Sequence, residues 1–189
     1  MKYLIILLAL IPAFIVGTII VHSMGFGWFD SCVVWCENAF GVIVPHPLHL
    51  WYYLSTLMGR SALWILIVAF WVTPAYTYIR FDLREFKKLL GGFAVGYAIV
   101  HLLFFALAHH WSLQSLGNAM VNHLFLSFGA GALLILALSP LSKASYKILY
   151  LGVVAMMIHL LLAYKILHLE HIIALSLLAT AMALRLIKR

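Results

Sequence analysis

Residues 84–101 read REFKKLLGGFAVGYAIVH: a basic turn runs directly into an apolar helix that carries one histidine, His101, deep inside it. A second stretch of the same kind is SYKILYLGVVAMMIHLLLAYK, residues 145–165, with His159 in the corresponding place. If both stretches cross a bilayer from the basic side, each histidine lies about seven residues, roughly 10 Å, from the outer end of its helix. The two imidazoles are therefore predicted at a similar depth.

Two neutral imidazoles that face each other at one depth can each give a nitrogen lone pair to the same iron, which is how a b-type heme is ligated between membrane helices. His101 and His159 are therefore the candidate axial ligands. Small residues let a flat macrocycle approach a helix backbone. The residues expected to line the pocket are Gly152, Ala155, Ala163 and Tyr97. The alternatives are a histidine hydrogen-bonded across the bundle and ordinary packing of small residues.

The composition is that of an integral membrane protein. Of the 189 residues, 66% are hydrophobic and 9% are charged, and the mean hydropathy is +1.11, values far from those of soluble domains. The net charge of +7 does not indicate nucleic acid, because the basic residues sit at the ends of apolar runs and form no patch interleaved with aromatic residues. No phosphate loop, nucleotide fingerprint or Ser/His/Asp arrangement appears either.

The apolar runs predict an all-α bundle of six transmembrane helices in a single domain, residues 1–189. The expected spans are about 3–21, 61–76, 89–108, 120–138, 146–166 and 171–186, with an outer interfacial loop at 22–56 that is rich in aromatic residues. Ten Lys and Arg residues then fall on the side of the termini: Lys2, Arg80, Arg84, Lys87, Lys88, Lys143, Lys147, Arg185, Lys188 and Arg189. Arg60 and Lys165 fall on the other side. Because cytoplasmic loops hold the excess of positive charge, both termini are predicted to be cytoplasmic.

Cys32 and Cys36 lie in the outer loop, four residues apart. On an oxidising side of the membrane they are candidates for a disulfide. The functional alternative is a redox-active pair, which would make the protein a thiol-quinone oxidoreductase. A non-redox channel or transporter is a further alternative, although a polar pore-lining stripe is missing. The histidines outside the two spans are expected to be interfacial and solvated: His22, His46, His49, His109, His110, His123, His168 and His171.

Several short motifs lie along roughly residues 45–189. They are Gly59-Arg60-Ser61-Ala62-Leu63, Thr73-Pro74, Leu90-Gly91 after the basic turn, His101, and Ile158-His159. In these motifs and in their order, the chain resembles the heme-binding membrane subunit of bacterial protein-methionine-sulfoxide reductase systems, the MsrQ/YedZ family of ferric-reductase-like transmembrane domains.

The resemblance implies a multi-pass protein of the bacterial inner membrane that carries electrons and is not itself the catalytic subunit. Its electrons would come from quinol or from a cytoplasmic flavin reductase, and FMN is a cofactor that the family suggests. They would pass through heme b to a periplasmic molybdopterin subunit that reduces methionine sulfoxide in damaged proteins.

Two positions depart from the family pattern. The family carries a further histidine thirteen residues before the one that matches His159, and here that place is taken by Tyr146. The family's first outer loop is also shorter, so residues 32–47 have no counterpart. One heme per chain is therefore expected.

Overall fold

The computed structural model describes residues 2–24, 34–35, 38–39, 50–80, 83–138, 145–163 and 168–187. In this part of the chain all regular structure is helical, as predicted. The α-helices are α1 (Lys2–Ser23), α3 (Leu50–Pro74), α4 (Lys87–Ala108), α5 (Leu113–Asn122), α6 (Leu124–Leu138), α7 (Ser145–Ala163) and α8 (Leu169–Ile187). A π-helical turn, η3 (Ala75–Ile79), prolongs α3, and a 3₁₀ turn, η4 (Arg84–Phe86), precedes α4.

Several of these helices are long and apolar enough to cross a membrane. Four qualify on length and hydropathy: Tyr3–Ser23, Leu50–Ile79, Lys87–Ala108 and Leu169–Ile187. A fifth span results if the bent pair α5 and α6 is taken as one unit. The helix over Lys147–Ala163 is apolar but shorter. The described residues therefore form a helical protein with four to five candidate membrane spans.

The second span begins earlier than the sequence analysis predicted, because α3 starts at Leu50 and not near residue 61. Leu50, Leu54 and Met58 recur every fourth residue and are buried against Ile15 and Ile19 of α1. This apolar stripe extends the helix into the segment that had been assigned to the outer loop. The aromatic residues at 51–53 are thus the first turn of a span.

The single continuous helix predicted over 120–138 is broken near its beginning. His123 has an extended backbone, with φ −129° and ψ 90°, and α5 and α6 meet there at 106°. Ser112 caps α5, its hydroxyl accepting a hydrogen bond from the Ser115 amide. The residues at 120–122 therefore belong to a separate short helix that turns away from the span.

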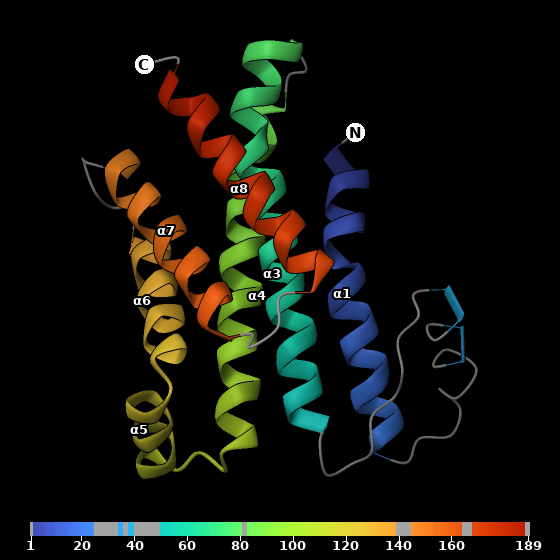
Figure 1. Cartoon of the computed structure of the whole chain (residues 1–189). Coiled ribbons are helices and arrows are strands. Elements are labelled where there is room, and N and C mark those ends of the chain that lie inside the picture. Colours follow the sequence, from blue (N-terminus) through green and yellow to red (C-terminus); the bar gives the residue numbers. More distant parts are fainter. Residues whose placement is uncertain are drawn as a thin grey trace.

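The helices are arranged as two hairpins with α1 and α8 packed beside them (Figure 1). The tightest pairs are α3 with α4 and α6 with α7. α1 begins and α8 ends at the end of the bundle where η3 and η4 join α3 to α4, and α5 lies at the opposite end (Figure 1). α4 and α7 run in the same direction, as expected for the two histidine-bearing helices.

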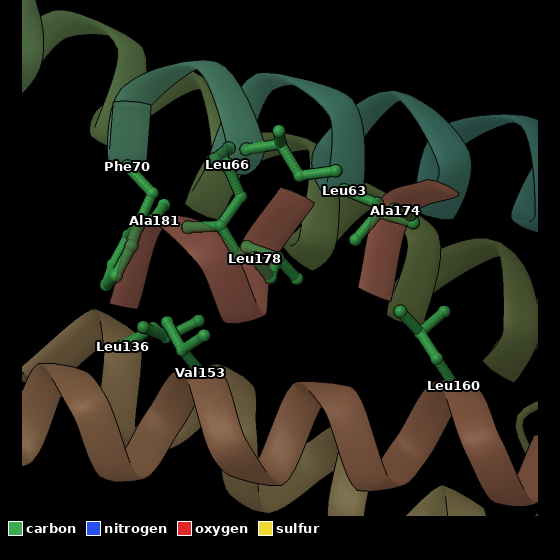
Figure 2. Packing of buried hydrophobic residues seen from close by; sticks show 11 residues of the cluster. Leu63, Leu66, Phe70, Leu136, Val153, Leu160, Ala174, Leu178 and Ala181 are labelled. Atoms are coloured by element: carbon green, nitrogen blue, oxygen red, sulfur yellow. The ribbon is translucent and has the colours of Figure 1, made fainter. Parts of the chain in front are cut away.

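The core on the side of α8 joins both hairpins. Figure 2 shows Leu63, Leu66 and Phe70 of α3 facing Ala174, Leu178 and Ala181 of α8, with Val153 and Leu160 of α7 beneath them. Together with Ile67, Ala94 and Leu136 these residues form a cluster of eleven, and all of its members are buried. The core fixes α7 relative to α3, and so holds the two hairpins together.

Polar side chains also join α3 and its extension η3 to α8, at a seven-residue spacing. The indole of Trp64 donates to the Glu170 carboxylate, that of Trp71 donates to the Leu177 carbonyl, and the Tyr78 hydroxyl donates to the Leu184 carbonyl. Each pair is separated by 106 residues, so α3 and α8 run parallel and stay in one register over three levels. A seven-residue repeat is the period of left-handed helix pairs.

Candidate functional site

His101 of α4 and His159 of α7 line one cavity, which has a volume of about 350 Å³. Its walls come from both hairpins and from the first turn of α8. Ala98 and Phe105 lie beside His101 on α4, and Ala163 lies beside His159 on α7. The two histidines that the sequence analysis paired are thus brought to one site.

The ring of His101 is held by the preceding helix, α3. Its Nδ1 lies 2.7 Å from the carbonyl oxygen of Ser55 and 3.0 Å from the Ser55 hydroxyl. That hydroxyl in turn donates to the backbone carbonyl of His101, at 3.1 Å. Because a carbonyl oxygen only accepts hydrogen bonds, the proton of the neutral ring is on Nδ1. The lone pair is therefore on Nε2.

The ring of His159 is held in the same way by its own preceding helix, α6. Its Nδ1 lies 2.6 Å from the carbonyl oxygen of Phe125. The proton is again on Nδ1, and Nε2 keeps its lone pair. This is the arrangement found in ligating histidines, whose second nitrogen donates to a carbonyl and so fixes the tautomer and the ring.

A glycine one turn beyond each carbonyl makes room for the imidazole. A Cβ built on Gly59 would come within 3.0 Å of Nδ1 of His101, and one built on Gly129 within 2.7 Å of Nδ1 of His159. Gly59 follows Ser55 by four residues, as Gly129 follows Phe125. The two hairpins therefore present equivalent half-sites: a carbonyl at position i, a glycine at i+4, and a histidine on the next helix.

Two nitrogen donors do not make a site for a bare metal ion. Among the described residues there is no group of three or more His, Cys, Asp or Glu side chains that could hold a metal. A structural zinc ion takes four protein ligands and a catalytic one takes three. An iron that arrives with a planar macrocycle needs protein ligands only on its two axial positions. The donor set therefore fits heme better than a free ion.

Not all of the predicted pocket residues face the cavity. Tyr97 is buried against α1, where its hydroxyl donates to the Ala9 carbonyl. Gly152 faces Leu136 of α6, and a Cβ built on this glycine would come within 2.9 Å of the Leu136 side chain. Neither these two residues nor the half-buried Ala155 is among the described residues that line the cavity. Of the predicted lining, Ala163 is in place.

The cavity contains contributors that the sequence analysis did not select. Met156 lies one turn before Leu160 on α7, and Phe125 and Leu126 begin α6. Ser55 and Phe125 each contact an imidazole through the backbone carbonyl, which residue type does not signal, and Ser55 adds its hydroxyl. The glycines carried a weak signal, since small residues at helix contacts are common in membranes.

The mouth of the cavity, beside the first turn of α8, is polar. The Arg60 guanidinium contacts the Glu170 carboxylate through two nitrogens, Nε to Oε1 at 3.0 Å and Nη2 to Oε2 at 2.6 Å. Trp64 donates to the same carboxylate at 3.2 Å. Arg60, Glu170 and the adjacent His171 all line the cavity.

The opposite wall is apolar. A small space of about 20 Å³ next to the site, toward the end of the bundle where α8 ends, is lined only by alanine, valine, leucine and methionine side chains. They are Ala62, Leu66, Ala94, Val95, Ala98, Leu133, Leu136 and Met156. The site is therefore polar on one side and apolar on the other.

Other predicted features fall elsewhere or outside the description. His109 packs on Phe105 near the mouth, with ring centroids 4.3 Å apart. His168 and His171 are neighbours at the start of α8, with ring centroids 5.9 Å apart. His171 is buried and lines the cavity, so the expectation that it is solvated was wrong. Cys32, Cys36 and the side chain of Tyr146 lie outside the described residues, so the predicted disulfide stays a prediction.

Comparison with protein-family models, with curated proteins and with solved structures finds no match to this chain. The functional assignment therefore rests on the geometry of the site and on the motifs of the sequence.

Proposed function

We propose that this protein is a heme b electron-transfer subunit of a membrane oxidoreductase, with His101 and His159 as the axial iron ligands. One observation carries the proposal: both imidazoles line one cavity, and each has its Nδ1 engaged by a backbone carbonyl of the preceding helix. Each ring thus keeps an Nε2 lone pair for iron. The bound heme supplies one-electron exchange between the ferric and ferrous states.

We further propose the six-span topology with cytoplasmic termini. α7 has 19 residues, about 28 Å at about 1.5 Å per residue, which nearly matches a hydrocarbon core of about 30 Å. In the proposed topology α7 is one span, and the bent pair α5 and α6 is another. The basic residues Arg80, Lys87 and Lys88 lie where α1 begins and α8 ends, which supports a cytoplasmic assignment of that end.

The partners follow from the family resemblance. We propose that the protein lies in a bacterial inner membrane and passes electrons to a periplasmic molybdopterin subunit that reduces methionine sulfoxide. His101 is seven residues from Ala108, the last of α4, and fourteen from Lys87, the first. It is therefore nearer the outer surface, which favours quinol as the donor over a cytoplasmic flavin reductase with FMN.

The visible absorption spectrum of the purified protein tests this function. A Soret band that shifts on addition of dithionite is expected, with the signature of low-spin, six-coordinate iron. His101→Ala and His159→Ala should each abolish the low-spin form. His109→Ala and His168→Ala serve as controls, because these histidines are not among the described residues that line the cavity. A full, unaltered spectrum in both ligand variants, or no heme in the native protein, would contradict the proposal.

A further inference from the structure

We propose that Arg60 is the binding partner of the two carboxylate groups of heme, its propionates, and that these leave the cavity through its outer mouth. This inference rests on the proposed heme ligation by His101 and His159. It adds the orientation of the macrocycle and a recognition site for its anionic edge, neither of which follows from axial ligation.

The apolar wall excludes the opposite orientation. The space on the inner side of the site is lined by eight alanine, valine, leucine and methionine residues. An ionised carboxylate without a partner is very costly to bury in such surroundings. The propionates must therefore face the mouth, where polar side chains and the membrane interface are found.

At the mouth, Arg60 is the one Lys or Arg among the described residues that line the cavity. Its contacts with Glu170 use Nε and Nη2. A guanidinium has five N–H donors in a fixed plane, so three remain for another anion. Trp64 braces the Glu170 carboxylate from α3, and the ion pair thereby holds the guanidinium at the cavity edge.

The charge of Glu170 should act on propionate binding in the direction opposite to the charge of Arg60. Its carboxylate lies in the same cavity lining as Arg60 and carries the same charge as a propionate. It holds the guanidinium in place, but it also repels an incoming carboxylate. Removal of its charge should therefore favour the propionates, whereas removal of the Arg60 charge should disfavour them.

The test compares heme with its dimethyl ester, in which both carboxylates are methylated and neutral. Heme-free full-length protein in detergent micelles is titrated with each porphyrin, and the ratio of the two Kd values is taken for every variant. This ratio cancels changes in fold or in axial ligation that affect both porphyrins alike. Arg80→Gln is the matched control, since Arg80 is an exposed arginine at the other end of α3 and η3.

The native protein should prefer the free acid by about tenfold or more, as expected for hydrogen bonds between charged groups. Arg60→Gln should bring the ratio of the two Kd values close to one. Arg60→Lys should retain part of the preference for the free acid, and Glu170→Gln should increase that preference. Arg80→Gln should leave it unchanged. If Arg60→Gln does not fold, Arg60→Lys and Glu170→Gln still give opposite shifts.

Equal affinity for the two porphyrins in the native protein, or a preference that Arg60→Gln leaves intact, would overturn this inference while the axial ligation stands. Failure of both porphyrins to bind, or binding that survives loss of both histidines, would overturn the proposed function instead.

Discussion

The imidazole of His159 lies against Gly129, so closely that a Cβ on this glycine would come within 2.7 Å of Nδ1. The same relationship joins His101 to Gly59, at 3.0 Å. Real Cβ atoms do not approach a ring nitrogen as closely as 2.7 Å, so either the helix or the histidine would have to move. Only glycine allows this approach while the carbonyl one turn earlier accepts the Nδ1 proton.

Gly129→Ala should therefore displace the His159 ring and weaken its hydrogen bond to the Phe125 carbonyl. We expect loss of the low-spin spectrum, with a larger effect than for Gly59→Ala because the contact is shorter. Absorption and electron paramagnetic resonance spectra of the ferric protein measure the loss of low-spin heme in each variant.

Gly131→Ala on the same helix is the control, since a Cβ there would meet nothing within 4 Å. It should keep the heme signature and stabilise α6 by up to about 1 kcal/mol, the usual difference between alanine and glycine in a helix. Identical spectra for the changes at 129 and 131 would contradict the role assigned to Gly129.

Ser55 makes the two half-sites unequal. Its hydroxyl is a second acceptor for the Nδ1 proton of His101, whereas Phe125 offers His159 only a carbonyl. Hydrogen bonding to the second nitrogen makes an imidazole a stronger ligand, and a stronger ligand favours ferric iron. Ser55→Ala should therefore retain heme and raise its midpoint potential by tens of millivolts, on the order of 1 kcal/mol.

Redox titration followed by absorption checks this value. Ser61→Ala is the matched control: it deletes a serine hydroxyl on the same helix that is bonded to the Leu57 carbonyl, away from the histidine. A potential that falls in Ser55→Ala, or shifts equally in both variants, would show that the hydroxyl does not act through His101.

The presence of His101 and His159 in one cavity could be predicted because it depends on distance along two apolar helices that run in the same direction. Helical rise converts sequence position into depth, so two histidines equally far from their outer ends fall at one level. The partners of the rings could not be predicted in this way. A carbonyl acceptor is present at every residue, and the relative rotation of two helices selects Ser55 and Phe125.

Rotation also explains why the structure places Tyr97 away from the cavity. Tyr97 precedes His101 by one helical turn, and on that basis it was placed on the heme face. In the structure, α1 packs against α4 and offers the Ala9 carbonyl to its hydroxyl. A buried hydroxyl needs a partner, and α1 supplies one that the cavity does not.

The sequence contains an indication of the bend between α5 and α6 that is lost when hydropathy is averaged over a window. The run from 113 to 138 is apolar enough to pass for one span, yet Gly117, Asn118 and Asn122 are poor helix formers. The backbone changes direction at His123, just after the last of them.

Trp71→Phe should destabilise the protein without altering the heme. The change removes the indole N–H that donates to the Leu177 carbonyl, one level of the link between α3 and α8. Such interhelical bonds in membranes contribute about 0.6 kcal/mol on average, so a small fall in the thermal unfolding midpoint in detergent is expected. Trp111→Phe, at an exposed tryptophan, should leave the midpoint unchanged. A changed Soret spectrum in Trp71→Phe would show that this link also shapes the cavity.

The protein should bind one heme per chain, in the outer half of the membrane. His101 and His159 use both of the histidines that lie well inside the predicted spans, and the other eight of the ten lie in or next to loops on the outer side in the proposed topology. In the family that the sequence resembles, a further histidine stands at the position of Tyr146. This position is about 20 Å from His159 at about 1.5 Å per residue, toward the cytoplasmic side in the proposed topology. A phenol binds heme iron as a phenolate, which needs cationic neighbours, whereas an interfacial tyrosine is common at the end of a span.

A pyridine hemochrome assay against protein concentration should give a ratio of heme to protein near one, and Tyr146→Phe should not change this ratio. A ratio near two in the native protein that falls to one in Tyr146→Phe would establish a second, inner heme. It would also restore a cytoplasmic flavin reductase as the electron donor in place of quinol.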